Sequence, residues 1–294
     1  MKIKKIINTL VLCVASSSAI SAWAESSVWK VTKGDKFFYI GGTVHLLSSS
    51  DLPLPKEFST AYNNSDEIIF ETDTEVANSL SSQQKLIAAM TLPGDQTLRT
   101  QLSPKAYQAL NTFFSERNLP LASFEKFKPW GVSLLVSVLE YQRWGLQAEF
   151  GVETVISELA QQDNKPLQEL ESFDEQLSFF KSMEAINNNQ VIEYTLSDLE
   201  QLPEFITDMR QNWRSGNLEQ FLENASIKEM KTKFPKMYNT LILNRNNRWI
   251  SQLDELNNDN KVEFVLVGSL HLPGEDGVLN KLQKKGYKVE QLNN

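Results

Sequence analysis

The chain contains only two histidines, and each lies three residues after a glycine that ends an apolar run. The two segments are Phe37-Phe38-Tyr39-Ile40-Gly41-Gly42-Thr43-Val44-His45 and Phe264-Val265-Leu266-Val267-Gly268-Ser269-Leu270-His271. Apolar, β-branched and aromatic runs that stop at glycine are typical of buried strands that lead into tight turns. We therefore expect both imidazoles in loops at strand ends, where open α/β sheets place their sites.

This arrangement constrains the topology, because His45 and His271 lie at opposite ends of the chain. They can share one site only if the first and last strands belong to the same sheet. Histidine is the commonest metal ligand and the usual acid or base near neutral pH, so a shared site would be suited to metal binding or proton transfer.

The remaining pattern alternates strand and helix signals near both termini and is helical in between. Strands are expected at 28–32, 36–40, 67–71, 166–170, 262–267 and 287–291, and helices at 56–64, 104–116, 129–145, 151–161 and 276–285, with several more between 173 and 256. The turn Lys33-Gly34-Asp35 indicates a hairpin between the first two strands. We predict an α/β fold with a mixed central sheet, formed by the N- and C-terminal αβ segments, and a largely helical middle region.

Residues 1–24 have the features of a signal peptide. Three lysines precede the short apolar run Ile6–Val14, and Ala22-Trp23-Ala24 supplies a cleavage site with small residues. Cleavage near Ala24 predicts an exported protein, periplasmic or secreted, with a single domain at 25–294, because no long linker divides the chain. An uncleaved anchor is the alternative. No later stretch is long and apolar enough to insert stably in a membrane.

Composition excludes several functions. Cleavage removes the only cysteine, Cys13, so the mature chain has neither a disulfide nor a thiol nucleophile. The formal net charge is −8 and becomes −11 when the three leader lysines leave. Such acidity disfavours nucleic acid and anionic membrane surfaces as partners.

Two carboxylates end the strand expected at 67–71. Glu71 and Asp73 are two residues apart, so both point to the same side of an extended chain. Together with two imidazoles they form a donor set suited to a divalent cation with an open coordination position. The alternative is that the carboxylates cap the next helix or face water, and that each histidine donates to a backbone carbonyl.

Other segments are ambiguous by themselves. Glu153 is expected in the first turn of a helix, where the helix dipole favours an acid regardless of function. Arg245 lies on a polar helical face, but an arginine also suits stabilisation of an oxyanion. Lys128-Pro129-Trp130 is typical of a loop end, a helix start and a packed ring. The compact motifs of zincins, serine hydrolases and phosphate loops do not occur.

An ordered set of short motifs covers nearly the whole mature chain. They are Gly42-Thr43-Val44-His45, Glu71-Thr72-Asp73, Lys128-Pro129-Trp130, Phe150-Gly151-Val152-Glu153, Leu170-Glu171-Ser172 with Gln176, Arg245-Asn246, Val267-Gly268-Ser269-Leu270-His271-Leu272-Pro273-Gly274, and Gly286-Tyr287-Lys288-Val289. In this order they resemble the TraB/GumN family, which is related to the Tiki metalloproteases that inactivate Wnt proteins. Single motifs are loose, whereas the ordered set is specific.

The resemblance implies an α/β scaffold, shared with erythromycin-esterase-like and haem-binding ChaN-like proteins, in which both Gly-x-x-His loops, a strand-end glutamate and an arginine converge. For the Tiki branch it also implies proteolysis that depends on manganese or cobalt; zinc is a further possibility. Because proteins on one scaffold differ in activity, the fold does not decide the chemistry.

The resulting hypothesis is an exported metal-dependent hydrolase that acts on a peptide or a small acyl substrate, with a peptidase as the favoured form. His45, Glu71 and His271 would be metal ligands, Asp73 or Glu153 a base or an orienting partner, and Arg245 the oxyanion stabiliser. Two alternatives stay open: a metal-independent, esterase-like hydrolase with His45 as base, and a non-catalytic module that binds a metal, haem or peptide. The sequence leaves the oligomeric state open.

Overall fold

The protein is described from a computed structural model that covers residues 25–293, apart from residues 224 and 259. The predicted signal peptide, residues 1–24, lies outside the described residues. Within the described ranges, no helix combines the length and apolar character needed to cross a bilayer.

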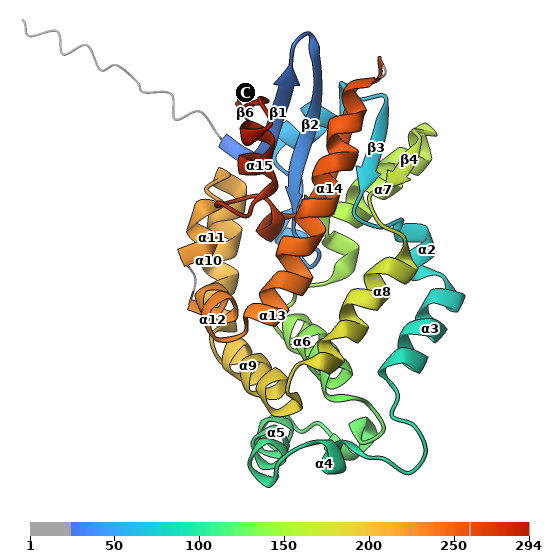
Figure 1. Cartoon of the computed structure of the whole chain (residues 1–294), viewed down its shortest axis with the longest axis vertical. Helices are drawn as coiled ribbons and strands as arrows, with labels where there is room; N and C mark the ends of the chain where they lie inside the picture. Colours follow the sequence, from blue (N-terminus) through green and yellow to red (C-terminus); the bar gives the residue numbers. More distant parts are fainter. Residues whose placement is uncertain (1–24, 224, 259, 294) are drawn as a thin grey trace, which may run out of the picture.

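A mixed six-stranded sheet forms one end of the molecule, as predicted (Figure 1). Its strand order is β4-β3-β5-β2-β1-β6. The strands are β1 Glu25–Lys33, β2 Lys36–Thr43, β3 Glu67–Phe70, β4 Leu167–Glu169, β5 Glu263–Gly268 and β6 Lys288–Asn293. The hairpin is confirmed: β1 and β2 are antiparallel, and Gly34 adopts a φ of +66° in the turn.

The C-terminal strand β5 lies between β2 and β3 and is parallel to both. Its apolar residues, Phe264 to Val267, are fully buried, because helices or loops cover both faces of this central strand. The requirement that the first and last strands share one sheet is therefore met. The carboxyl ends of β2, β3, β4 and β5 face the same edge, since these four strands are parallel to one another.

The five helices predicted with bounds occur within a few residues of those bounds, whereas the helices at 74–78, 80–90 and 98–101 were not predicted. The helices are α1 Lys56–Asn63, α2 Thr74–Asn78, α3 Leu80–Met90, α4 Leu98–Gln101, α5 Pro104–Glu116, α6 Pro129–Arg143, α7 Val152–Asp163 and α8 Phe173–Ser182, followed by α9 Asn188–Glu200, α10 Leu202–Ser215, α11 Glu219–Glu223, α12 Ala225–Lys233, α13 Pro235–Tyr238, α14 Asn244–Glu255 and α15 Val278–Lys284. The hydroxyl of Ser103 accepts a hydrogen bond from the amide of Ala106 and caps α5, whose first residue is Pro104.

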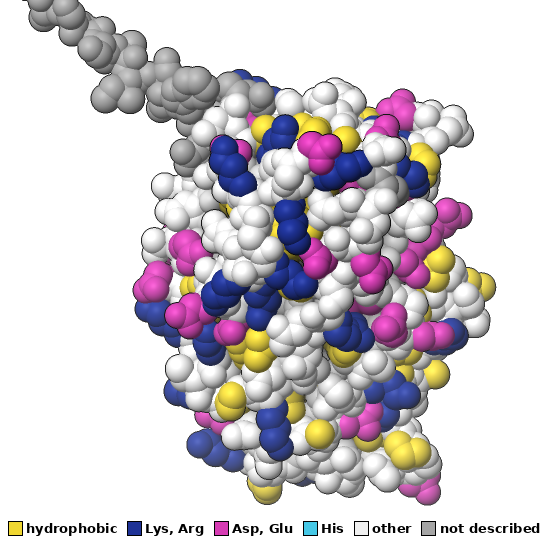
Figure 2. Space-filling model, turned by 45° about the horizontal axis from the view of Figure 1, so that its top comes forward, with side chains coloured by type: hydrophobic (Ala, Val, Ile, Leu, Met, Phe, Trp, Pro, Cys, Tyr) yellow, Lys and Arg dark blue, Asp and Glu magenta, His cyan; other side chains and the backbone are white. Residues whose placement is uncertain are grey.

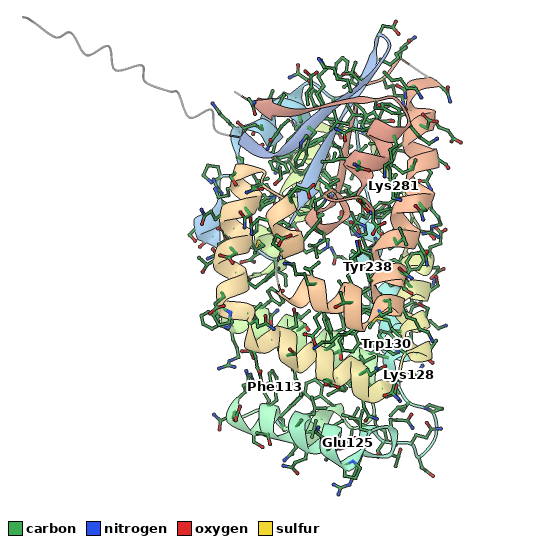
Figure 3. All side chains as sticks on the ribbon, turned by 60° about the vertical axis from the view of Figure 1, so that its left-hand side comes forward. Phe113, Glu125, Lys128, Trp130, Tyr238 and Lys281 are labelled. Carbon is green, nitrogen blue, oxygen red and sulfur yellow. The ribbon has the colours of Figure 1, made fainter. Side chains whose placement is uncertain are left out.

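The helical middle region forms the end of the molecule opposite the sheet, with α5 farthest from it (Figure 1). Two hydrophobic clusters hold it together: one joins α5, α6, α9 and α10, and the other joins α6, α9, α12 and α13. Figure 3 places Phe113 of the former at the far end, and Trp130 and Tyr238 of the latter nearer the sheet.

The histidine loops lie where these helical clusters meet the core around the sheet. Leu46, beside His45, packs against the α5–α10 cluster. Leu270, beside His271, packs against both the sheet core and the α12–α13 cluster. On the outer surface, acidic and basic side chains are interspersed rather than separated on the face shown in Figure 2.

Candidate functional site

Four polar side chains lie just beyond the carboxyl ends of the four parallel strands. Glu71 follows β3, Glu171 lies two residues after β4, and His45 lies two residues after β2. His271 closes the single 3₁₀ turn, Ser269–His271, that comes directly after β5. Parallel strands bring these side chains to one edge although more than 200 positions separate the first from the last.

Arg245, from the first turn of α14, joins three of these groups. Its Nη2 donates to Oε2 of Glu71 and to Oε1 of Glu171, at 2.5 Å each. Its Nε donates to Oε2 of Glu171 at 3.2 Å, and its Nη1 lies 3.1 Å from Nε2 of His271. Such a fork-shaped guanidinium can hold two carboxylates in fixed orientations, which a lysine cannot do.

This network sets the charge of the buried carboxylates. Burial would raise the pKa of Glu71, but Arg245, the two histidines and the amide of Gly268, which donates at 2.6 Å, lower that pKa to about 2. For Glu171 burial prevails and raises the pKa, with Arg245 opposing it. Glu71 is therefore ionised at neutral pH and paired with a buried cation.

His271 is buried and held on both sides of its ring. Its Nδ1 lies 2.6 Å from Oδ1 of Asn246. The ring packs on Trp249, with centroids 4.5 Å apart. Burial lowers the pKa of His271 to about 3, with Arg245 contributing and Glu71 opposing, so the imidazole is neutral near pH 7.

His45 differs from His271 in exposure and in charge. Its side chain is 67% exposed, whereas that of His271 is 5% exposed. Nδ1 of His45 lies 2.6 Å from Oε1 of Glu153, which also accepts a hydrogen bond from the hydroxyl of Thr43. The nearby Glu153 carboxylate raises the pKa of His45 to about 9. His45 is an accessible imidazole oriented by a carboxylate, the arrangement of a general acid or base.

The contact between His45 and Glu153 depends on a close approach of two backbones. A Cβ at Gly151 would lie 2.2 Å from the carbonyl oxygen of His45. Without that side chain, the amide of Val152 donates to the carbonyl of Val44 at 3.2 Å, and the first turn of α7 lies against the loop. Gly151 is thus the residue that lets Glu153 reach the imidazole.

Gly268 lies at the centre of the site, where Glu71, His271 and His45 approach one another. A Cβ there would lie 3.2 Å from Oε1 of Glu71, 3.6 Å from Cδ2 of His271 and 3.7 Å from Nε2 of His45. Three groups of the kinds that bind divalent ions therefore border one glycine. Among the described residues, however, no three His, Cys, Asp or Glu side chains lie close enough to hold an ion as they are placed. The donors suit an ion chemically, but Arg245 must move away from His271 to admit one.

Two predicted segments lie outside this cluster. The carboxylate of Asp73 accepts hydrogen bonds from the amides of Glu75 and Val76 and caps α2, the alternative that the sequence left open. Lys128 pairs with Glu184 on the helical side of the molecule, and the ring of Trp130 is buried (Figure 3). The packing interpretation of Lys128-Pro129-Trp130 is confirmed.

The structure adds residues that sequence reasoning did not assign to the site. Glu171 had a usable signal, because it ends a strand in the same way as Glu71. Asn246 lies next to Arg245 in the sequence, but its pairing with a ring 25 positions away has no local signal. Arg248, which also binds Glu171 at 3.1 Å, lies one helical turn after Arg245.

Comparison with known proteins identifies relatives over most of the chain. Residues 27–291 match the family model described as the TraB/PrgY/gumN family. "Uncharacterized protein YbaP" of Escherichia coli (strain K12) is 24% identical over 250 residues, which cover 85% of this chain and 89% of that protein. The Shigella flexneri protein of the same name matches with the same identity and coverage. No solved structure matches.

Proposed function

Because the chain belongs to the TraB/PrgY/gumN family, we propose that it is an exported hydrolase that cleaves amide or ester bonds at the strand-end site. A peptidase is the favoured form. One observation carries the proposal: the exposed imidazole of His45 is oriented by Glu153 and lies beside Gly268, where Glu71 and His271 also meet. An exposed, oriented imidazole beside a buried carboxylate and a second imidazole suits acyl transfer.

In the metal-independent form of the reaction, His45 would transfer protons. In its deprotonated form it takes a proton from the attacking water, and the resulting imidazolium, stabilised by Glu153, returns a proton to the leaving group. The contact with Glu153 through Nδ1 leaves Nε2 as the atom that faces the substrate. Thr43 holds the same carboxylate oxygen and so fixes its direction.

Arg245 would stabilise the negative charge that develops on the carbonyl oxygen. Its Nη1 contacts the neutral acceptor of His271, while Nη2 and Nε are held by carboxylates. A substrate oxygen can replace the histidine as the acceptor for Nη1 without disturbing those ion pairs. The guanidinium is thus oriented before the substrate binds. A donor oriented in advance stabilises the transition state most, because it does not have to reorganise during the reaction.

In the metal-dependent form, His45, His271 and Glu71 would instead hold a divalent ion, manganese, cobalt or zinc, once Arg245 has left Nε2 of His271. The ion would polarise the scissile carbonyl and lower the pKa of a bound water, with Glu153 as the base or as the orienting partner of His45. Metal-independent hydrolysis, with His45 as the base, is the second candidate, because Arg245 already contacts Nε2 of His271 and supplies a cation.

The test is hydrolysis by the mature chain, purified without a histidine tag, of mixed peptides and of acyl esters. We expect activity that His45→Gln abolishes and that Glu149→Gln, a change of an exposed acid outside the cluster, leaves intact. Loss of activity in chelator, with recovery on added manganese, cobalt or zinc, supports the metal-dependent form. Activity that survives chelation and dialysis supports the metal-independent form.

An inactive protein that binds haem, a metal ion or a peptide at this site would contradict the proposal and favour a binding module. Export is tested separately by fractionation of cells that produce the chain with residues 1–24 intact. Recovery of a shortened chain outside the cytoplasm is the expected result.

A further inference from the structure

Asn246 is completely buried, and its amide group has a single possible orientation. Nδ2 lies 3.1 Å from the carbonyl oxygen of His271 and 2.8 Å from that of Asp276. Carbonyl oxygens only accept hydrogen bonds, so the side of the amide that faces them must be the NH₂ group. The opposite side, which faces the imidazole of His271, is then Oδ1.

This orientation determines where the imidazole carries its proton. Oδ1 of Asn246 is only an acceptor, and it lies 2.6 Å from Nδ1 of His271. A hydrogen bond at that distance requires a proton on Nδ1. In a neutral ring, Nε2 then carries no proton and can accept a hydrogen bond.

The other side of the ring gives the same answer independently. Nη1 of Arg245 lies 3.1 Å from Nε2 of His271, and a guanidinium can only donate. A proton on Nε2 would lie against an N–H proton of the Arg245 guanidinium. The ring is also fixed in place, because it is 4% exposed and packs on Trp249.

Asn246 fixes the backbone as well as the ring. Its two donated hydrogen bonds join α14 to the 3₁₀ turn that carries His271 and to the loop at Asp276. Because Arg245 precedes Asn246 on the same helix, one turn of α14 supplies both the cation that contacts Nε2 of His271 and the oxygen that accepts from Nδ1. The position of His271 relative to Gly268 is therefore set by this turn.

We propose that Asn246 is a positioning residue that holds His271 as the Nδ1–H tautomer and so presents an unprotonated Nε2 beside Arg245 and Gly268. This inference rests on the proposed function and deepens it. Once Nη1 of Arg245 has turned to a substrate oxygen, Nε2 of His271 can accept a hydrogen bond from a water or a substrate group, or it can bind an ion. In the metal-independent form, the two histidines then have opposite roles, because His45 transfers protons.

The chain suits a direct test, because only two histidines contribute signals when histidine is labelled with ¹⁵N. Long-range ¹H–¹⁵N correlation spectra separate protonated from unprotonated ring nitrogens, and His45→Gln identifies which ring is His271. We expect His271 in the unmodified mature protein to show a protonated Nδ1 and an unprotonated Nε2 at pH 7. A proton on Nε2, or on both nitrogens, would overturn the inference.

Two variants then ask whether Asn246 is responsible. Asn246→Asp keeps an oxygen that accepts from Nδ1 but loses both donated hydrogen bonds to the carbonyls of His271 and Asp276, so we expect the proton on Nδ1 to persist in a less stable protein. Asn246→Leu removes the acceptor at similar volume, so we expect mixed tautomers for His271, unchanged signals for His45, and a kcat lower by about 10- to 100-fold. An unchanged tautomer in the Leu variant would show that Arg245 suffices and would overturn the role of Asn246.

The outcomes separate this inference from the proposed function. The Nδ1–H tautomer in a protein that hydrolyses none of the substrates would uphold the inference and remove the hydrolase. If Asn246→Leu does not fold, the unmodified protein still decides the tautomer, and Asn246→Asp still decides whether an oxygen acceptor maintains it.

Discussion

Nδ1 of His45 lies 2.6 Å from Oε1 of Glu153, and this contact connects the loop after β2 to the first turn of α7. The two residues are more than 100 positions apart in the sequence. The first turn of α7 positions Glu153, and the lack of a side chain at Gly151 lets this turn pack against the backbone of His45. The packing of two backbone segments therefore orients an exposed imidazole.

Glu153→Gln tests this contact. The neutral amide removes the charge that raises the pKa of His45 to about 9, so we expect that pKa to fall toward its ordinary value of 6.5. Activity should fall by about 10- to 100-fold, as it does when an orienting partner is lost. NMR titration of the two histidines measures the pKa, and Glu149→Gln is the matched control. A His45 pKa that stays near 9 in the variant would show that Glu153 is not its cause.

The two histidines should give the folding stability opposite dependences on pH. The folded-state pKa of His45 lies above its unfolded value of 6.5, so its contribution is complete below pH 6.5 and is lost as the pH rises through about 9. The folded-state pKa of His271 is lowered to about 3, so its contribution is present above pH 6.5 and is lost as the pH falls toward 3. Denaturant unfolding from pH 3 to pH 9 should therefore show greatest stability near pH 6.5.

Variants separate the two limbs of this pH profile. We expect His45→Gln to flatten the alkaline limb and His271→Gln to flatten part of the acid limb. Glu71, whose pKa is lowered to about 2, adds a loss of stability below pH 4.5 that remains in both variants. An alkaline limb that persists in His45→Gln would rule out this origin.

Much of the fold follows from local patterns. The apolar runs before Gly42 and Gly268 give β2 and β5, and Ser103-Pro104 marks the start of α5, because burial and capping act over a few residues. The position of β5 between β2 and β3 has no local signal. It depends on which strand pairs bury the most apolar surface, and it was predicted only as the condition for a shared site.

The sequence predicted which residues lie near one another better than it predicted their contacts. Arg245 contacts His271 and Glu71, and His45 lies near the same glycine, Gly268, whereas their role as a site stays a prediction. Asp73 instead caps α2, because its carboxylate accepts hydrogen bonds from the amides of Glu75 and Val76, which have no partner within the helix. Such a choice depends on where the chain turns after the strand, which the spacing of two carboxylates does not specify.

Arg245→Met should destabilise the protein strongly. It leaves the carboxylate of Glu71 buried without its cation and that of Glu171 paired only with Arg248, and breaking a buried ion pair in this way costs about 3–5 kcal/mol. Denaturant unfolding measures the loss. Lys85→Met is the control, because Lys85 pairs with the exposed Asp174 and its removal should cost less than about 1 kcal/mol. Equal losses in the two variants would refute the buried network.

Gly268→Ala tests whether the lack of a side chain at the centre of the site is needed for activity. The added methyl would lie 3.2 Å from Oε1 of Glu71 and 3.7 Å from Nε2 of His45, close contacts that small side-chain shifts can relieve. We expect a loss of only about 1 kcal/mol in the free energy of unfolding. Activity should nevertheless fall by about 100-fold, because the methyl fills the position of a water, an ion or a reacting carbonyl. Gly151→Ala provides the contrast: its methyl would meet the backbone oxygen of His45 at 2.2 Å, so stability should fall by about 3 kcal/mol. A fully active Gly268→Ala protein would place the chemistry elsewhere, whatever the two imidazoles do.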